Sequence, residues 1–360
     1  MSGSGAARLT GILRGAIPSL IALALGLVVA SLVMLAFGED PISIFSALFV
    51  GALTTQYGQS SVINYMYAYL LLALAFLIPG KAGIWNIGGQ GQAILGGVAA
   101  ALVMEFVVLP PVIWPLAAIV LAVLAGAGWS AISGLLEAYR NASAIVTTIM
   151  TNFIAANLAT FVLYYVLIPQ AHTLSFYSFV DFPPALTLPT LPYFTSSIMI
   201  FVAILVAVGS AFFLSRTTLG YKVRATGLGA RPAESKGINP RSTKVVAMLI
   251  GGGIAGLAGA GAVMSVGHGC GNIACYQDAF AAGWFGGFGF AGIAVALVAA
   301  NNPIGSIFSA VFFSVLAAGM PYIYQDIYIV WAMQGIIILF MAAPELSRMI
   351  VTLRGGRKWT

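Results

Sequence analysis

Three side-chain amides stand among glycines near residue 90, inside a stretch that is otherwise apolar. The segment GIWNIGGQGQAILGG, residues 83–97, contains Asn86, Gln90 and Gln92. Polar side chains in lipid are costly unless they are satisfied, and a broken helix is tolerated only where it faces protein or a water-filled cavity. Two interpretations stay open: a discontinuous helix whose amides line a solute path, or a helix cap whose amides bond neighbouring helices.

A second polar stripe follows in the segment IVTTIMTN, residues 145–152. At about 100° per residue, Thr147, Thr148, Thr151 and Asn152 share one arc of roughly 140°, which predicts a face that points into a helical bundle. Threonine hydroxyls in helices commonly bond back to a carbonyl one turn earlier. We therefore expect Asn152 to be the residue that reaches a pathway, with Thr148 beside it.

Aromatic side chains alternate with glycines in AAGWFGGFGFAGIAVAL, residues 281–297. Trp284 and Phe288 are candidates for stacking on sugars or nucleobases beside a cavity. An aromatic belt at the membrane interface explains the same pattern. A lone carboxylate, Glu105, falls inside a predicted span, where acids are functional candidates, but its closeness to Pro110 favours a position at the outer interface.

No catalytic signature finds its required context. GGGIAG at 251–256 and GFGFAG at 287–292 fit G-x-G-x-x-G, yet neither follows a strand of a βαβ unit. Both are better explained as close-packing helix faces. A P-loop is absent from the sequence, so we expect a chain that is not an enzyme, with any ATP hydrolysis on separate subunits. The two cysteines, Cys270 and Cys275, and two histidines predict neither a metal site nor a cofactor.

Composition explains why these amides stand out. Of 360 residues, 61% are hydrophobic and 7% charged, with a mean hydropathy of +1.02, against roughly 25% charged residues in a soluble domain. A spanning helix needs roughly 20 apolar residues. The apolar runs predict an all-α polytopic transmembrane bundle that forms a single domain, residues 1–360. This bundle is expected to contain about ten spanning helices. The predicted spans are 16–37, 61–79, 84–109, 112–137, 143–168, 197–215, 244–266, 280–300, 303–321 and 327–343, with a re-entrant alternative over 280–321.

Lys and Arg fall in segments that an even number of spans places on one side. These segments are the N-terminal residues 1–15, Arg140, the loop 216–243 and the tail 344–360. Cytoplasmic loops retain basic residues, so we expect both termini in the cytoplasm and a multi-pass protein of the plasma membrane. The other side then receives Glu39, Asp40, Asp181, Asp278 and Asp326.

Two connections between spans are long enough to hold a surface feature. The external loop 169–196 is rich in Pro and Phe, which suits a rigid platform for an external partner. The internal loop 216–243 is strongly basic and too short for a catalytic domain. This loop must therefore act through another protein.

Five segments, in order and spacing, resemble the permeases of ABC importers for simple sugars and nucleosides, relatives of the ribose and branched-chain amino acid permeases. They are GEDPISIFSALFVGAL (38–53), GIWNIGGQGQAILGG (83–97), AIVTTIMTNFIA (144–155), LGYKVRATGLGARPAESKGI (219–238) and GFGFAGIAVALVAANNPIG (287–305). The resemblance covers nearly the whole chain. It implies a nucleoside or sugar importer with two permease subunits, alike or different, two cytoplasmic ATPase subunits and an extracellular solute-binding lipoprotein.

The resemblance also implies roles for particular residues. Leu219–Ile238 looks like the segment that docks on the ATPase, and its matching positions are Arg224, Gly227, Glu234 and Gly237. Two positions depart from the family, which usually has glutamate where this chain has Gln90 and commonly has another where Ala144 stands. The resemblance therefore defines the class of transporter better than it defines the solute.

The competing interpretation is an ion-coupled secondary transporter or a channel for a small polar solute. Such a protein is expected to carry acids or histidines within the membrane for coupling, and this chain offers Glu105. An intramembrane enzyme lacks a paired nucleophile and base at a suitable depth. The sequence therefore favours the ATP-driven importer.

Overall fold

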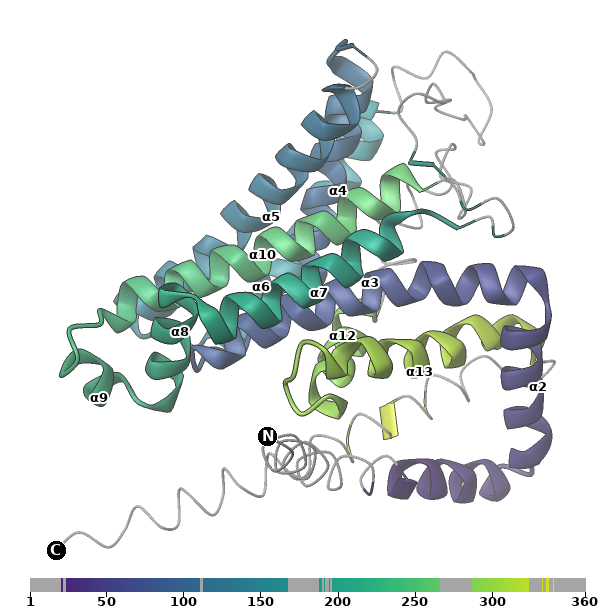
Figure 1. The fold of residues 1–360 in the computed structure, drawn as a ribbon. Helices are drawn as coiled ribbons and strands as arrows, with labels where there is room; N and C mark the ends of the chain where they lie inside the picture. The colour runs from purple at the N-terminus through teal and green to yellow at the C-terminus, as the bar shows by residue number, and fades with distance from the viewer. Residues whose placement is uncertain are drawn as a thin grey trace, which may run out of the picture.

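A computed structural model describes residues 24–110, 113–167, 196–265 and 287–323, together with positions 21, 188, 189, 191, 194, 332, 335, 336 and 339. Within these residues the regular secondary structure is helical, apart from an isolated bridge between Leu188 and Ser265 (Figure 1). In chain order the elements are Ala24–Ala36, α2 (Pro41–Thr54), α3 (Gln56–Lys81), α4 (Gly89–Phe106), α5 (Ile113–Arg140), α6 (Ala144–Val162), the π-helix η1 (Leu163–Leu167), α7 (Met199–Arg216), α8 (Thr218–Leu228), α9 (Ala230–Glu234), α10 (Pro240–Met264), α12 (Phe288–Val298), α13 (Gly305–Gly319) and the 3₁₀ turn η5 (Met320–Tyr322).

Six helices are long and apolar enough to cross a membrane. They are α3, α5, α6 continued by η1, α7, α10, and α13 continued by η5. Ala24–Ala36 and α2 meet at 120° and add a seventh span if the bent pair counts as one. The prediction of an all-helical polytopic bundle is confirmed for the described residues, whereas they contain fewer spans than the predicted ten.

Helix α3 forms the centre of the bundle. Residues 67–79 along it are almost completely buried, as expected of a helix that is apolar on every side. Helices α7, α10, α12 and α13 all pack against it (Figure 1). A helix that is interrupted where it packs against this part of α3 is therefore interrupted inside the protein.

Helix α10 packs against α4 and α5 through glycines of the GGGIAG segment. A Cβ on Gly252 would lie 2.5 Å from the carbonyl oxygen of Gly126 on α5, and Gly256 touches Gly96 on α4 and Ala122 on α5. Small residues let backbones approach closely in a membrane, where van der Waals packing holds helices together. The predicted close-packing role of this segment is confirmed.

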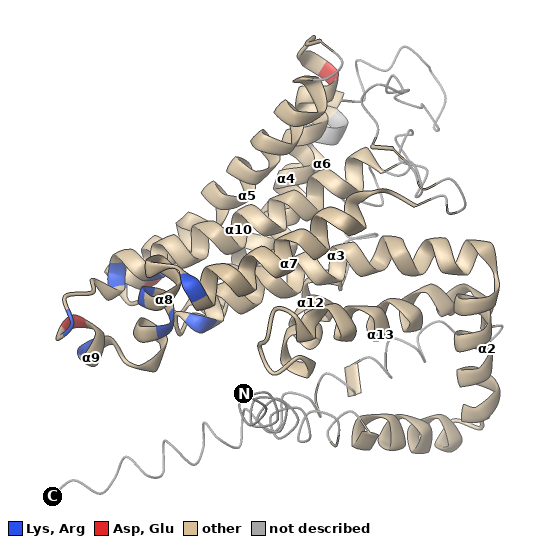
Figure 2. Ribbon diagram, viewed as in Figure 1, with Lys and Arg blue, Asp and Glu red and all other residues tan. Residues whose placement is uncertain are grey.

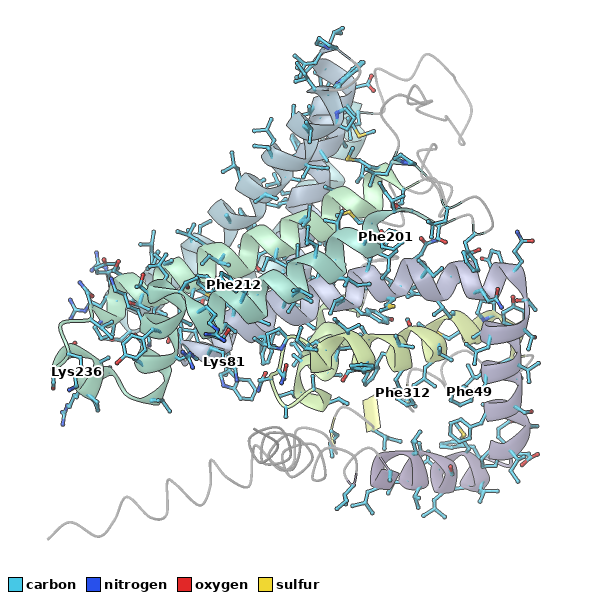
Figure 3. The ribbon with its side chains drawn as sticks, viewed as in Figure 1. Phe49, Lys81, Phe201, Phe212, Lys236 and Phe312 are labelled. Atoms are coloured by element: carbon cyan, nitrogen blue, oxygen red, sulfur yellow. The ribbon has the colours of Figure 1, made fainter. Side chains whose placement is uncertain are left out.

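Large apolar side chains cover the outer faces of α5, α6 and α7. Phe201 and Phe212 on α7 are 61% and 63% exposed (Figure 3). Helix α6 is the least buried candidate span, with 17% of its most apolar window inside the subunit. Contiguous apolar surface of this kind contacts lipid or another protein.

Helix α2 lies across one end of the bundle and joins Ala24–Ala36 to α3 (Figure 1). It begins after Asp40, whose carboxylate accepts hydrogen bonds from two first-turn N–H groups at 3.1 and 3.2 Å, with Pro41 at the first helical position. Thr55, between α2 and α3, shares a 2.5 Å hydrogen bond with the hydroxyl of Tyr322 after α13. The sequence analysis left this helix as a connection between spans.

Two further predictions need correction. The predicted span 84–109 begins with non-helical residues, and α4 starts at Gly89. The loop 216–243 is mostly helical, because Thr217 caps α8 by accepting the N–H of Gly220 at 3.0 Å, and α9 follows.

Helix α12 crosses only part of a membrane. Its 11 residues extend about 16 Å at 1.5 Å per residue, which is roughly half of a hydrocarbon core of about 30 Å. The chain then turns at Ala300 and Asn301, with φ of 50° and 54°, and α13 packs alongside α12. Over residues 287–319 this geometry fits the re-entrant alternative better than the predicted span 280–300.

Several predictions fall outside the described residues. They concern the N-terminal segment 1–15, most of the external loop 169–196, most of the span 327–343 and the tail 344–360.

Basic side chains gather at one end of the bundle, around α8 and α9 (Figure 2). Lys81, at the end of α3, and Lys236, after α9, both lie there (Figure 3). Helices α5 and α7 bring their C-terminal Arg140 and Arg216 to this basic end. Glu105, in the last turn of α4, lies at the other end of its helix from the linker described below.

Candidate functional site

The candidate site lies where α3 gives way to α4. Helix α3 ends at Lys81, Gly83 turns the chain with φ of +81°, and α4 begins at Gly89. Gly89 lies against Leu72, so the linker, residues 82–88, has run back along α3 by nine residues, or about 13 Å. Helix α4 therefore starts within the bundle, as a discontinuous helix does.

Asn86 and Gln92 form a reciprocal amide pair across this break. The Asn86 amide nitrogen donates to Gln92 Oε1 at 3.0 Å, and Gln92 Nε2 donates to Asn86 Oδ1 at 2.9 Å. Asn86 also donates to the Ala75 carbonyl at 3.1 Å and accepts the N–H of Gly88 at 3.1 Å. Both side chains are 1% exposed, so they hold the break together and are closed to a solute in this conformation.

Asn152 connects α6 to both sides of the break. Its Nδ2 donates to the Ile87 carbonyl at 3.0 Å, and its Oδ1 accepts the N–H of Gly91 at 2.8 Å. Thr148, one turn earlier, is fully buried and bonds back to the Ala144 carbonyl at 2.6 Å. The polar stripe thus faces the break, with Thr148 satisfied by its own helix and Asn152 reaching across.

Gln90 differs from the other amides. It is half-buried, and its side chain makes no hydrogen bond within the described part of the chain. Gly289 on α12 lies against it, where a Cβ would come 2.9 Å from the Gln90 Cβ. The first turns of α4 and α12 therefore meet at Gln90, with one amide left available.

Three aromatic rings meet beside this junction. Phe288 packs edge-on against Tyr69 and Tyr65 of α3, with ring centroids 5.0 and 5.5 Å away. The sequence analysis singled out Phe288 but missed both tyrosines, which lay in an apolar run without glycines. Trp284, the other predicted aromatic, lies outside the described residues, as do Cys270 and Cys275.

The basic end presents the residues assigned to ATPase coupling. Arg224 on α8 and Glu234 on α9 are exposed, and Gly237 adopts φ of +73° after α9. Gly227 packs on the end of α3, where a Cβ would overlap the Lys81 carbonyl and come 3.3 Å from the Gly83 nitrogen. All four residues are therefore exposed in the segment of α8 and α9, and Gly227 touches the linker.

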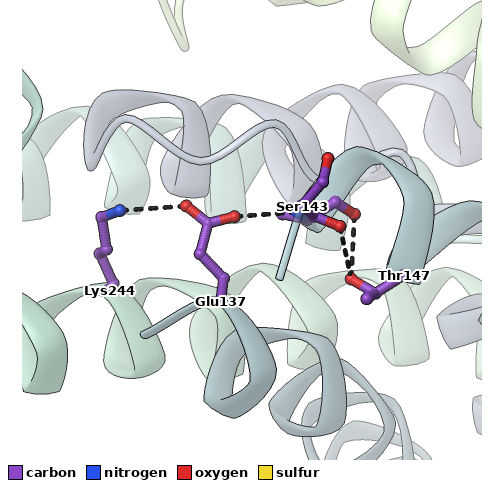
Figure 4. Close-up of polar contacts among 5 residues, drawn as sticks. Glu137, Ser143, Thr147 and Lys244 are labelled. Carbon is purple, nitrogen blue, oxygen red and sulfur yellow. Dashed lines mark hydrogen bonds and ion pairs between the residues drawn. The ribbon is translucent and has the colours of Figure 1, made fainter. Parts of the chain in front are cut away.

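An ion pair near this end escaped the sequence analysis. Glu137 Oε1 on α5 receives Lys244 Nζ of α10 at 3.0 Å, and Glu137 Oε2 accepts the N–H of Ala144 at the start of α6 at 3.0 Å (Figure 4). The pair thus ties three helices together. Glu137 and Lys244 both lie at the ends of predicted spans. The sequence signal for a polar contact there was the carboxylate of Glu137, one turn before the basic Arg140.

The described residues contain no group of three His, Cys, Asp or Glu side chains suited to a metal ion. Their polar residues instead satisfy one another around the break between α3 and α4. Together, the apolar helices, the interrupted α4 and the half-length α12 define a polytopic membrane protein with discontinuous helices, which are typical of transporters.

Comparisons with known proteins agree with this class. Residues 58–342 match the family described as branched-chain amino acid transport system, permease component. The nucleoside ABC transporter permease NupB of Lactococcus lactis is 30% identical over 321 residues, which cover 87% of this chain and 86% of NupB. The guanosine ABC transporter permease NupP of Bacillus subtilis is 31% identical over 342 residues, covering 92% and 94%.

The glucose ABC transporter permease TsgB13 of Haloferax volcanii is 29% identical over 342 residues, covering 89% of this chain and 86% of TsgB13. No solved structure matches the chain. The chain belongs to the branched-chain amino acid transport system permease family. It is an ABC importer permease subunit, a multi-pass protein of the plasma membrane.

Proposed function

We propose that this chain carries a nucleoside through the membrane, as one of two permease subunits in an importer driven by separate ATPases. The observation that carries the proposal is the match over nearly its full length to NupB and NupP, named for nucleoside and guanosine transport. The free amide of Gln90 beside Tyr65, Tyr69 and Phe288 supports it. Amides suit hydrogen bonds to a base, and aromatic rings suit stacking on one.

Glucose is the second candidate solute, since the relative TsgB13 is named for glucose transport. Aromatic rings also pack on the apolar faces of sugars. We place it second, because NupB and NupP, at 30% and 31% identity, are named for nucleoside and guanosine transport.

The basic end is the proposed cytoplasmic side, because cytoplasmic loops retain Lys and Arg. That orientation, an even number of spans and cytoplasmic termini complete the proposed topology. An extracellular binding lipoprotein would then dock at the opposite end, through the loop 169–196.

The surface of α8 and α9 suits an ATPase partner. Leu228 is 91% exposed between Arg224 and Arg231, in a segment too polar to lie in lipid. The exposed Leu228 and the charged side chains around it are therefore available to a partner protein. We therefore assign ATP hydrolysis to cytoplasmic subunits that bind Leu219–Ile238, with no cofactor in this chain.

The test is uptake of labelled guanosine by vesicles that contain the permeases, the ATPase and the binding protein. Uptake should require the ATPase, and it should be lost when Arg224 and Glu234 are replaced by alanine or Leu228 by serine. Ser242→Ala, exposed in the first turn of α10 and outside Leu219–Ile238, is the matched control and should transport normally. Guanosine uptake by the permease alone would favour the secondary transporter, and glucose uptake without guanosine uptake would favour the sugar.

A further inference from the structure

A cavity opens at the basic end of the bundle, beside the ion pair. Its volume is about 340 Å³, and it lies between the linker and the residues that join α5 to α6. The lining residues are Gly83, Trp85, Glu137, Asn141, Ala142, Ser143, Ala144, Ile145 and Lys244. Four separate segments thus contribute to one open, largely polar cavity.

The charges of the cavity wall cancel. Glu137 and Lys244 neutralise each other at 3.0 Å, and the second carboxylate oxygen holds the N–H of Ala144 (Figure 4). Each carboxylate oxygen still has a lone pair, and the ammonium has three donor hydrogens. The pair therefore offers acceptors and donors to an uncharged ligand, and because its charges cancel it supplies no net positive charge with which to bind a phosphate.

Trp85 adds a flat apolar surface to this polar wall. Its ring is fixed edge-on against Phe76, with centroids 5.8 Å apart and planes at 88°. The exposed side chains of Asn141 and Ser143 add an amide and a hydroxyl. An indole face beside amide, hydroxyl and carboxylate groups matches a nucleobase, which stacks through its face and hydrogen-bonds along its edge.

Helix α6 leads from the cavity to the break between α3 and α4. Ala144 lines the cavity, Thr148 lies one turn deeper against Gly88, and Asn152 lies a further turn in. Each step of four residues is about 6 Å. The hydrogen bonds of Asn152 to Ile87 and Gly91 close the far end of this seam.

We propose that this cavity is the inner release site of the transporter, which binds an uncharged nucleoside and rejects the corresponding nucleotide. The inference rests on the proposed function and adds a location and a selectivity to it. The closed seam at Asn152 separates the release site from the junction at Gln90. A nucleoside passing along α6 meets Trp85 before it reaches the cytoplasm.

A labelling experiment on the assembled importer tests the release site. Ser143→Cys is introduced after Cys270 and Cys275 are replaced by serine, and inverted vesicles are treated with a membrane-impermeant maleimide. Guanosine should slow labelling by about tenfold, which corresponds to occupancy of about 90% of the sites. Guanosine 5′-monophosphate at the same concentration should leave the rate unchanged. Ser242→Cys, exposed in the first turn of α10 and outside Leu219–Ile238, should be labelled at the same rate with and without guanosine.

A second pair of variants tests the role of the indole. Trp85→Ala should raise the guanosine concentration needed for half-protection several-fold, and Trp85→Phe should raise it less. Guanosine uptake by the Ser143→Cys importer is measured in parallel. Three outcomes would overturn the release site. They are a failure of guanosine to slow labelling in an importer that transports it, equal protection of Ser143→Cys by the nucleotide, and coverage of that position by the ATPase. Failure of the parent importer to transport guanosine would instead overturn the proposed solute.

Discussion

Asn152 accepts the backbone N–H of Gly91 at 2.8 Å, and this hydrogen bond joins the middle of α6 to the first turn of α4. Gly91 permits the approach, because a Cβ there would lie 2.9 Å from the Asn152 Cα. The same side chain donates to the Ile87 carbonyl. Helix α6 therefore cannot separate from the broken helix without exchanging two hydrogen bonds for new ones.

Replacing Asn152 with alanine should loosen this contact. The variant leaves the Gly91 N–H and the Ile87 carbonyl without partners, at a cost of about 1–3 kcal/mol for each buried group that stays unsatisfied. Thermal unfolding of the purified permease should move to lower temperature, and guanosine uptake should fall. Asn157→Ala is the matched control, because Asn157 is exposed on the same helix and bonds only the Phe153 carbonyl. Equal effects of the two substitutions would show that the contact to Gly91 has no special role.

The pair formed by Asn86 and Gln92 should behave as one unit. Asn86→Leu leaves the Gln92 amide buried without its partner, and Gln92→Leu leaves Asn86 with its bonds to Ala75 and Gly88 alone, so each single variant should lose about 1–3 kcal/mol of stability. The double variant should lose less than the sum, with a coupling of about 0.5–3 kcal/mol. Denaturant unfolding of all four proteins in detergent gives the cycle. Strict additivity would mean that the two amides are satisfied independently.

The sequence predicts the helices that cross the membrane because apolar length is a local property. Spans such as 112–137 and 197–215 agree with α5 and α7 to within three residues. The same signal misses α2, since hydropathy does not distinguish a helix that crosses the bundle end from a connection. It also extends α4 backward, because the linker from Ala82 to Gly88 is as apolar as a helix.

The candidate site could be predicted only as residue types near one another. Glycine and amide spacing located Asn86, Gln92 and Asn152, but it could not say that they bond one another instead of a solute. Tyr65 and Tyr69 were hidden because their partner Phe288 is more than 200 positions away. Contacts between distant segments depend on the packing of α3 and α12, which no local pattern contains.

Two glycines on α5 should respond oppositely to the same substitution. A Cβ on Gly126 would lie 2.8 Å from the Gly256 Cα of α10, whereas one on Gly128 meets nothing within 4 Å. Gly126→Ala should therefore cost about 1–3 kcal/mol by overpacking. Gly128→Ala should stabilise the helix by about 0.5–1 kcal/mol, through the lower entropy of alanine in the unfolded chain. Unfolding temperatures in one detergent compare them, and similar shifts would contradict glycine-mediated packing of α5 on α10.

Gly227 should transmit movement from the ATPase surface to the linker. It lies where α8 touches the end of α3, so a Cβ there must displace the Lys81 carbonyl and the nearby Gly83 nitrogen. Gly227→Ala should separate these segments at a cost of about 1–3 kcal/mol, and guanosine uptake should fall. ATP hydrolysis and ATPase binding should persist, because Arg224 and Leu228 stay exposed for docking.

The matched control for Gly227 is Gly80→Ala. Gly80 stands one residue before Lys81 in α3, and a Cβ there meets nothing within 4 Å. That variant should transport at the unmodified rate. Loss of ATPase binding in Gly227→Ala would assign the residue to docking, and normal uptake would remove it from the coupling path. Reduced uptake with intact ATP hydrolysis and intact ATPase binding would place the transmission step at the contact between α8 and the linker.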